Sequence, residues 1–140
     1  IQGFRYYNVY GNGEDEKIKL NQSSPVSKFK DDILKKGFLN LFKGSDKFYR
    51  DFVNVADVIN VVLNNKNDSG IYDLGTSAPV SFRDVAEEVA NVYNGHIIEI
   101  PFPEHLKHKY QSYTCAKKEW DSREFKFKTV RNFLDENNLV

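Results

Sequence analysis

The run from Gly3 to Gly11 is the feature that most constrains how this 140-residue chain can fold. It consists largely of aromatic and β-branched residues, which favour a strand. Its apolar residues are nearly continuous rather than alternating, as is typical of a strand buried on both faces of a parallel sheet. Such a strand needs neighbours, and no residues before it supply them. Because the chain opens at Ile1 directly on this run, we expect it to be part of a larger protein.

After this run, strand patterns and helix patterns alternate in short units. Helical spacing of apolar residues begins behind the capping residues Ser24 and Ser81, and Gly37 and Gly95 stand where those helices should end. Further helices are expected at 55–64 and from about Thr129, short strands at 39–42, 50–53, 71–74 and 96–100, and a loop at 12–21. The alternation predicts an α/β or α+β class. No G-x-G-x-x-G motif follows a strand, so the chain alone cannot build a complete dinucleotide site.

Two of the expected helices show which residues should face the core. Residues at helical spacing share one face, and an apolar face packs inward. The helix behind Ser24 carries Val26, Phe29, Ile33 and Leu34, and the helix at 55–64 carries Val55, Val58, Ile59, Val62 and Leu63. Residues 125–128 alternate Phe and Lys, which is typical of an exposed strand.

Composition excludes several classes of protein. Lys plus Arg and Asp plus Glu each number 20, so a zero net charge gives no general attraction to nucleic acid or anionic lipid. No run approaches the ~18 apolar residues that span a membrane. Cys115 is the single cysteine and cannot form an internal disulfide, and the three histidines lack zinc spacing, so we expect no metal site. We therefore expect a cytoplasmic globular protein.

Several short strings carry residues suited to binding a phosphorylated ligand. In order they are RYYNVYG at 5–11, FKGS at 42–45, RDFVNVADV at 50–58, YDLGT at 72–76, PFP at 101–103 and KYQSYT at 109–114. Arg50 offers planar, bidentate, permanently charged donors that match a diphosphate. An ion pair with Asp51 or Asp57 is the alternative. The turn at 42–45 can present backbone amides and a hydroxyl, or serve only as a hairpin turn.

In this order, the strings resemble the C-terminal half of extended short-chain dehydrogenases/reductases that act on nucleotide-sugars. The strings at 42–45, 101–103 and 109–114 narrow the resemblance to the ADP-L-glycero-D-manno-heptose 6-epimerases of lipopolysaccharide synthesis. It extends from Gly3 to about Asn137. It implies an α/β, Rossmann-type enzyme of which residues 1–11 are the last portion of the sheet and residues 12–140 the substrate-binding domain, with the N-terminal Rossmann part largely absent.

The resemblance also implies roles for individual residues. Substrate contacts fall on Asn8, Asn21, Lys28, Phe42, Lys43, Gly44, Ser45, Arg50 and Tyr110, and a contact with NADP falls on Val9. Lys19 corresponds to a catalytic acid/base that works opposite the Tyr of a Y-x-x-x-K motif, and Lys17 is the alternative. From the residues alone, Asn8 could equally be a capping residue, Tyr110 a core aromatic and Lys19 a solvated lysine. The segment at 19–24 departs from the family pattern because it lacks a glycine.

The expected function follows from the resemblance. The complete enzyme would be an NADP-dependent isomerase that inverts C6 of the heptose in an ADP-sugar, and a homo-oligomer, by resemblance a pentamer. The chain alone should be inactive, because the glycine-rich loop and the Y-x-x-x-K pair are not in it. The alternatives are a 4-epimerase or 4,6-dehydratase acting on a UDP-, GDP- or dTDP-sugar, and a non-catalytic nucleotide-sugar-binding or interaction module whose open strand at 4–10 seeks a partner.

Overall fold

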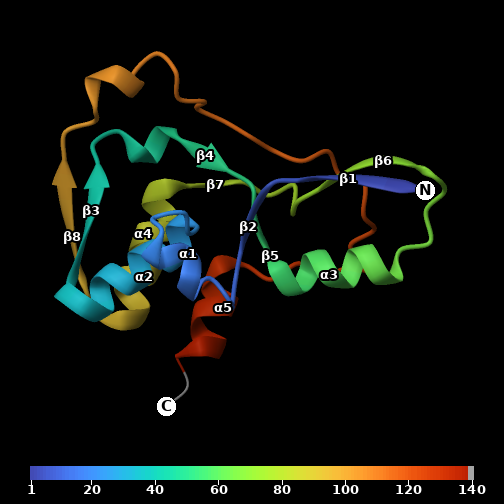
Figure 1. The fold of residues 1–140 in the computed structure, drawn as a ribbon, viewed down its shortest axis with the longest axis horizontal. Helices are drawn as coiled ribbons and strands as arrows, with labels where there is room; N and C mark the ends of the chain where they lie inside the picture. The colour runs from blue at the N-terminus through green and yellow to red at the C-terminus, as the bar shows by residue number, and fades with distance from the viewer. Residues whose placement is uncertain (139–140) are drawn as a thin grey trace.

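The structure, a computed structural model, describes residues 1–138 and contains four pairs of strands with helices around them (Figure 1). Three pairs are parallel: β1 (Gln2–Tyr6) with β6 (Gly70–Leu74), β2 (Asn8–Tyr10) with β5 (Phe52–Asn54), and β3 (Phe38–Phe42) with β8 (His96–Ile100). The pair β4 (Tyr49–Arg50) with β7 (Val80–Ser81) is antiparallel. The helices are α1 (Asp15–Lys19), α2 (Pro25–Lys36), α3 (Val55–Asn64), α4 (Phe82–Tyr93) and α5 (Val130–Asn137), with short 3₁₀ helices η1 (Ser45–Lys47) and η2 (Glu104–Leu106).

The first apolar run is two strands rather than one. The Tyr7 amide donates to the Leu74 carbonyl at 3.1 Å, and the Asn8 amide donates to the Asp51 carbonyl at 3.0 Å. The chain therefore changes partner between these residues, from β6 to β5. The pairing is parallel, as predicted, but burial on both faces is wrong, because Arg5 and Tyr6 are exposed.

The helix boundaries follow from local chemistry. The Ser24 hydroxyl accepts the Ser27 amide at the start of α2, and Gly37 ends that helix at a φ of 82°. Ser81 and Asp84 form a capping box at the start of α4, as predicted. That helix ends on Asn94 in the left-handed region, one residue before the expected glycine.

The loop expected at 12–21 contains the five-residue helix α1. None of its residues is buried, so it carries no apolar face from which a helix could be predicted. The strand-like alternation at 125–128 forms no strand. Phe125 instead packs into the core.

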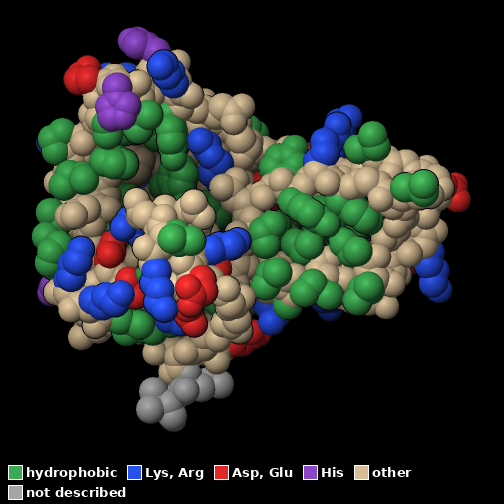
Figure 2. Space-filling view, viewed as in Figure 1, with side chains coloured by type: hydrophobic (Ala, Val, Ile, Leu, Met, Phe, Trp, Pro, Cys, Tyr) green, Lys and Arg blue, Asp and Glu red, His purple; other side chains and the backbone are tan. Residues whose placement is uncertain are grey.

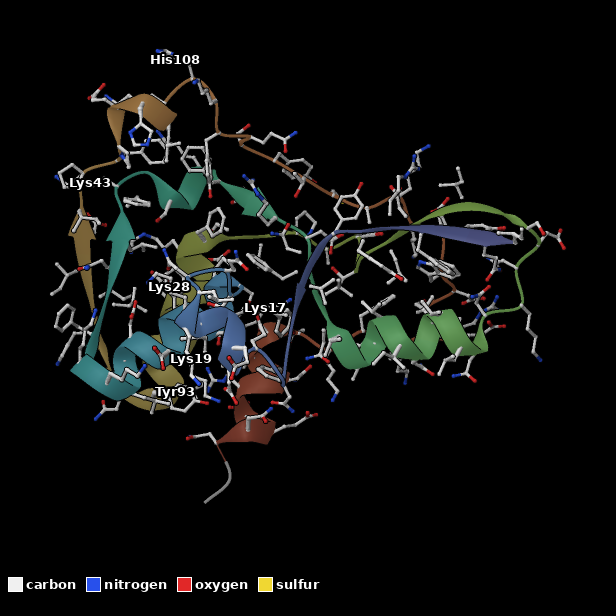
Figure 3. The ribbon with its side chains drawn as sticks, viewed as in Figure 1. Lys17, Lys19, Lys28, Lys43, Tyr93 and His108 are labelled. Atoms are coloured by element: carbon white, nitrogen blue, oxygen red, sulfur yellow. The ribbon has the colours of Figure 1, made fainter. Side chains whose placement is uncertain are left out.

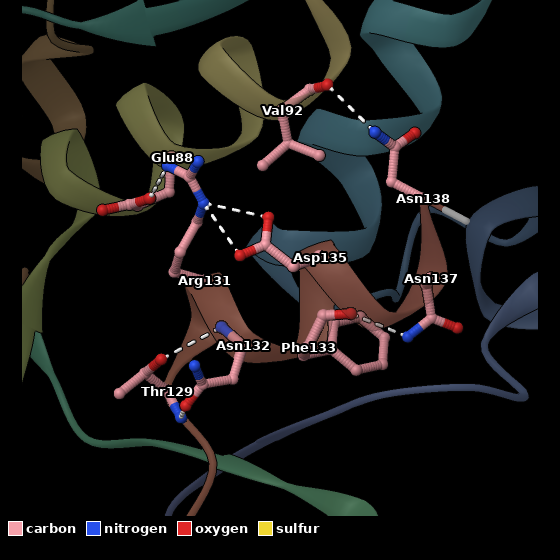
Figure 4. Close-up of polar contacts among 9 residues, drawn as sticks. All are labelled: Glu88, Val92, Thr129, Arg131, Asn132, Phe133, Asp135, Asn137 and Asn138. Atoms are coloured by element: carbon pink, nitrogen blue, oxygen red, sulfur yellow. Dashed lines mark hydrogen bonds and ion pairs between the residues drawn. The ribbon is translucent and has the colours of Figure 1, made fainter. Parts of the chain in front are cut away.

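Two hydrophobic cores hold the elements together. The larger core lies among α2, α4, α5 and β3, and its residues include Tyr10, Val26, Phe29, Ile33, Leu39, Val85, Val89, Phe133 and Leu134. The smaller core lies beside α3 and β6 and consists of Val53, Val58, Val61, Leu74, Trp120 and Phe125. The helix α5 is also fastened to α4 by an ion pair of Arg131 with Glu88 at 3.0 Å (Figure 4).

Three residues expected in the core are exposed instead: Leu34 at 62%, Ile59 at 53% and Leu63 at 74%. On α3 the buried residues are Val58, which belongs to the predicted stripe, and Val61, which does not, so the helix is rotated relative to that stripe. Figure 2 shows hydrophobic side chains gathered over the lobe formed by β1, β6 and α3. Exposed Tyr6 and Ile71 lie on the two strands of that lobe.

Candidate functional site

A cleft of about 430 Å³ lies between α2, β3 and the segment that follows β8. Figure 2 shows it as a hollow rimmed by hydrophobic side chains, beneath η2. Its walls include the predicted residues Lys28, Phe42, Ser45 and Tyr110, together with Phe29, Leu41, Phe48, Phe82, Ile100 and Phe102. A concave, mostly apolar site with a few polar groups is the usual form of a small-molecule pocket.

Arg50 lies directly behind this wall. It ends β4 and is only 9% exposed. Its guanidinium carbon lies 5.3 Å from the ring centroid of Phe82 and 5.0 Å from that of Tyr110. Its Nη1 donates to the Tyr49 carbonyl at 2.8 Å. Cation–π contacts hold the plane of the guanidinium in one orientation.

Arg50 has no counter-ion within the part of the chain that the structure describes. Both carboxylates that could have paired with it are used elsewhere. The Asp51 carboxylate accepts hydrogen bonds from Thr76, Ser77 and Ala116, and Asp57 accepts the Lys128 amide at 2.7 Å. A buried cation is normally paired, so this guanidinium is suited to an anion from outside the chain.

Five aromatic rings surround the outer part of the cleft. Phe48 and Phe102 stack with ring centroids 5.3 Å apart and an interplanar angle of 9°. Tyr110 meets both rings edge-on, at 5.2 and 5.9 Å. Phe42 meets Phe102 at 5.7 Å, and Phe82 lies 6.0 Å from Phe52 below. The sequence did not indicate Phe48 or Phe82 as residues of the site. Phe82 could have been found, because it follows the predicted cap Ser81 and lies on the apolar face of α4.

The turn at 42–45 has a left-handed glycine and leaves few of its polar groups exposed. Gly44 has a φ of 85°, which favours glycine, and Ser45 is buried at 4% exposure. The Lys43 amide is already used, because it donates to the Ile100 carbonyl at 2.8 Å. Ser45 lines the cleft. The Lys43 side chain is exposed at the end of β3 (Figure 3).

The remaining predicted residues are not part of this cleft. Asn8 and Val9 lie on β2, beside β5. Lys19 ends α1 with its side chain 72% exposed and its Nζ 3.3 Å from Glu16, and Asn21 follows with a φ of 56°. Figure 3 shows Lys17 and Lys19 at α1, with Lys28 on the neighbouring α2. Lys28 connects the two regions, since it lines the cleft while its Nζ lies 3.5 Å from Asp32.

The glycine-containing turn between β2 and α1, at Gly11 and Gly13, is occupied by the buried Glu14 carboxylate. That carboxylate accepts the Gly11 amide at 3.1 Å, the Ser24 amide at 2.7 Å and the Ser27 hydroxyl at 2.5 Å. Burial raises the pKa of Glu14, but these hydrogen bonds outweigh it and leave the pKa lowered. A carboxylate that is ionised and buried there would repel a phosphate.

Residues 1–138 contain no group of three His, Cys, Asp or Glu side chains placed to bind a metal ion. They also contain no helix long and apolar enough to cross a bilayer.

No protein-family model matches the chain. Among solved structures, the chain is similar to an ADP-L-glycero-D-manno-heptose-6-epimerase from Helicobacter pylori, with a TM-score of 0.76 and 24% identity over 96% of this chain and 42% of that one. A UDP-glucose 4-epimerase from Thermotoga maritima, solved with UDP-glucose, gives 0.72 and 18% over 96% and 44%. A dTDP-glucose 4,6-dehydratase from Bacillus anthracis, solved with NAD, gives 0.70 and 18% over 98% and 43%.

This chain has part of the fold of an extended short-chain dehydrogenase/reductase. The predicted fold class is therefore confirmed. At these identities the likeness establishes the fold alone. The chain spans less than half the length of the proteins that it matches.

Proposed function

We propose that this chain is the substrate-binding part of an ADP-sugar epimerase, and that Arg50 binds the diphosphate of the substrate. The observation that carries the proposal is the buried guanidinium that has no carboxylate partner in residues 1–138 and lies over two aromatic rings. A diphosphate presents paired oxygens that match the planar fork of an arginine. Hydrogen bonds to charged groups contribute about 1.5–3 kcal/mol each.

The aromatic cleft would hold the nucleotide. Base–aromatic stacking contributes about 1–3 kcal/mol per base, and Phe42, Phe102 and Tyr110 supply rings on one wall. The Ser45 hydroxyl offers a polar contact at the end of that wall, and the Lys43 and Gly44 turn fixes its position. This arrangement supports a nucleoside diphosphate as the part of the substrate that the cleft and Arg50 bind. Substrates would then differ only in their sugar.

The sugar would extend from Arg50 toward α1 and β2, where Asn8, Asn21 and Lys28 would contact it. In this proposal Lys19 acts as one acid/base at the reacting carbon, with Lys17 as the alternative. A lysine that serves as a base must be shielded from water or lie close to another cation. Because Lys19 is exposed in this chain, another part of the enzyme would have to cover it.

That covering part would be a dinucleotide-binding half. We propose that residues 1–11 belong to its sheet and residues 12–140 form the substrate-binding domain. Among residues 1–138, strand β1 has one neighbour, β6, and its other edge is open to a further strand. NADP would be held mainly by that half and would supply the redox chemistry at C6, with Val9 as the contact from this chain. An immunoblot of source cells tests this: a band near twice 16.3 kDa supports it, and a band at 16.3 kDa would require a separate cofactor subunit.

Other nucleotide-sugars are distinguished by titration. The native polypeptide is titrated calorimetrically with ADP, UDP, GDP and dTDP, and incubated with NADP and ADP-heptose while the two C6 epimers are followed by NMR. We expect ADP to bind most tightly and the epimers to interconvert. Preference for UDP or dTDP would favour the 4-epimerase or 4,6-dehydratase, whose structures match nearly as well.

A non-catalytic binding or interaction module is the second candidate, and one observation favours it. The lobe of β1, β6 and α3 exposes Tyr6, Ile59, Leu63 and Ile71, which is the surface expected of a chain that docks on a partner. Binding of ADP without epimerisation, by a native polypeptide of 16.3 kDa, would support it. For the epimerase we propose a cytoplasmic homo-oligomer, with a pentamer as the expected state. Sedimentation of the native polypeptide measures the oligomeric state.

A further inference from the structure

The carboxylate of Asp51 lies at the junction of three segments of the chain. It is 0% exposed. Its Oδ1 accepts the Thr76 amide and the Thr76 hydroxyl, both at 2.7 Å. Its Oδ2 accepts the Ser77 amide at 2.9 Å and the Ala116 amide at 3.0 Å. The backbone carbonyl of the same residue accepts the Asn8 amide from β2.

All four donors to the side chain are neutral. A buried carboxylate is costly to desolvate, and here the N–H and O–H groups of two loops compensate that cost without a cation. The turn at 75–77 and the segment ending at Ala116 are therefore ordered around the residue that follows Arg50. Gly75 adds a steric constraint, since a Cβ there would lie 2.6 Å from Oδ2 of Asp51.

The segment from Tyr110 to Ala116, called here the Tyr110 strap, runs beside β4. The Tyr49 amide donates to the Ser112 carbonyl at 2.8 Å, and the Thr114 amide donates to the Tyr49 carbonyl at 3.2 Å. The same Tyr49 carbonyl accepts Nη1 of Arg50. One end of the strap places the Tyr110 ring over Arg50, and Asp51 holds the other end.

We propose that Asp51 is a positioning residue that fixes the Tyr110 strap over Arg50. Its carboxylate anchors Ala116, and the Tyr49 carbonyl then holds both the strap and the guanidinium. This inference deepens the proposed function, because the strap forms one side of the proposed diphosphate site. It predicts that Asp51 affects ligand binding only through Arg50 and Tyr110.

The first test measures the strap itself. Hydrogen exchange of the native polypeptide is followed by mass spectrometry for the wild type, for Asp51→Asn and for Asp57→Asn. The control removes a carboxylate that also joins two distant segments, because Asp57 accepts the Lys128 amide. We expect amide exchange across 110–116 to rise about tenfold or more in Asp51→Asn, and not in the control. Unchanged exchange there, or an equal rise throughout the chain, would overturn the proposal.

The second test is a double-mutant cycle on ADP affinity. Asp51→Asn is expected to weaken ADP binding about tenfold in the presence of Arg50, and to have little further effect in Arg50→Ala. Additive losses would mean that Asp51 supports the fold only. If Asp51→Asn does not fold, Thr76→Val removes one of the four hydrogen bonds and should raise strap exchange by a smaller factor. Wild-type protein that does not bind ADP would contradict the proposed function, while the exchange rates would still decide whether Asp51 holds the strap.

Discussion

The guanidinium carbon of Arg50 lies 5.0 Å from the ring centroid of Tyr110, although the two residues come from different parts of the fold. Contact with an aromatic face orients a guanidinium without neutralising it. Phe82 makes a second such contact. The charge of Arg50 therefore stays available to a ligand while its plane is fixed.

The contact predicts how changes at Tyr110 affect binding. Tyr110→Leu removes the ring that orients Arg50 and that would stack on the base, and it is expected to weaken ADP binding by about 1–3 kcal/mol. Tyr110→Phe keeps the ring and serves as the matched control, with affinity within about 0.5 kcal/mol of the wild type. Calorimetric titration measures both, and equal losses in the two variants would point to the hydroxyl instead.

A pair of leucines tests the assignment of the larger core. Leu134 is 0% exposed and Leu34 is 62% exposed. Leu134→Ala is expected to lower the free energy of unfolding by about 2–5 kcal/mol, because it leaves a cavity. Leu34→Ala should change it by less than about 0.5 kcal/mol. Urea unfolding of the native polypeptide compares them, and similar losses would place Leu34 in a buried interface.

The lowered pKa of Glu14 should make the free energy of unfolding depend on pH. Its pKa in the folded protein is lowered from an ordinary value of 4.5 by hydrogen bonds from Ser24, Ser27 and Gly11, which outweigh the effect of burial. The stabilisation is therefore complete above the unfolded pKa and is lost as the pH falls through the lower folded value. Urea unfolding between pH 7 and pH 3 should show wild-type protein losing its advantage over Glu14→Gln below about pH 4.5. An advantage that stays constant to pH 3 would contradict this account.

Gly75 tests the close packing around Asp51. A Cβ on Gly75 would lie 2.6 Å from Oδ2 of Asp51 and 2.8 Å from Cβ of Ala116. Gly75→Ala is expected to lower the free energy of unfolding by about 1–3 kcal/mol and to weaken ADP binding. Gly3→Ala is the control, since its nearest neighbour would be Ile71 at 3.7 Å. Unfolding curves for the two variants that coincide would show that the Asp51 region can adapt.

Much of the local structure was predictable from sequence. The predicted caps Ser24 and Ser81 open α2 and α4, because a hydroxyl that accepts a free amide is a local interaction, and α5 begins behind Thr129, where a helix was expected. The buried face of α3 was predictable only in part, since Val58 was expected in the core and Val61 was not. Its residues are apolar on several sides, and tertiary packing against Trp120 and Leu74 selects Val58 and Val61 for burial.

The candidate site was likewise predictable from sequence only in part. Arg50, Phe42, Ser45 and Tyr110 are indicated by motifs, and the structure brings them to one cleft and its wall. The stacking of Phe48 on Phe102 depends on how β4 and the segment after β8 meet, which no local pattern encodes. The short helix α1 was missed because it carries no buried apolar face; the Glu14 carboxylate joins Gly11 before the helix to Ser24 after it.

The most direct measurement of the central claim is the affinity of the native polypeptide for ADP, in the wild type and in Arg50→Ala. Calorimetric titration is predicted to show a loss of about 1.5–3 kcal/mol in Arg50→Ala, the contribution of hydrogen bonds to a charged group. Arg123→Ala removes an arginine whose side chain is 88% exposed, and it should bind as the wild type does. Equal affinity in Arg50→Ala and the wild type would remove Arg50 from the site and contradict the account.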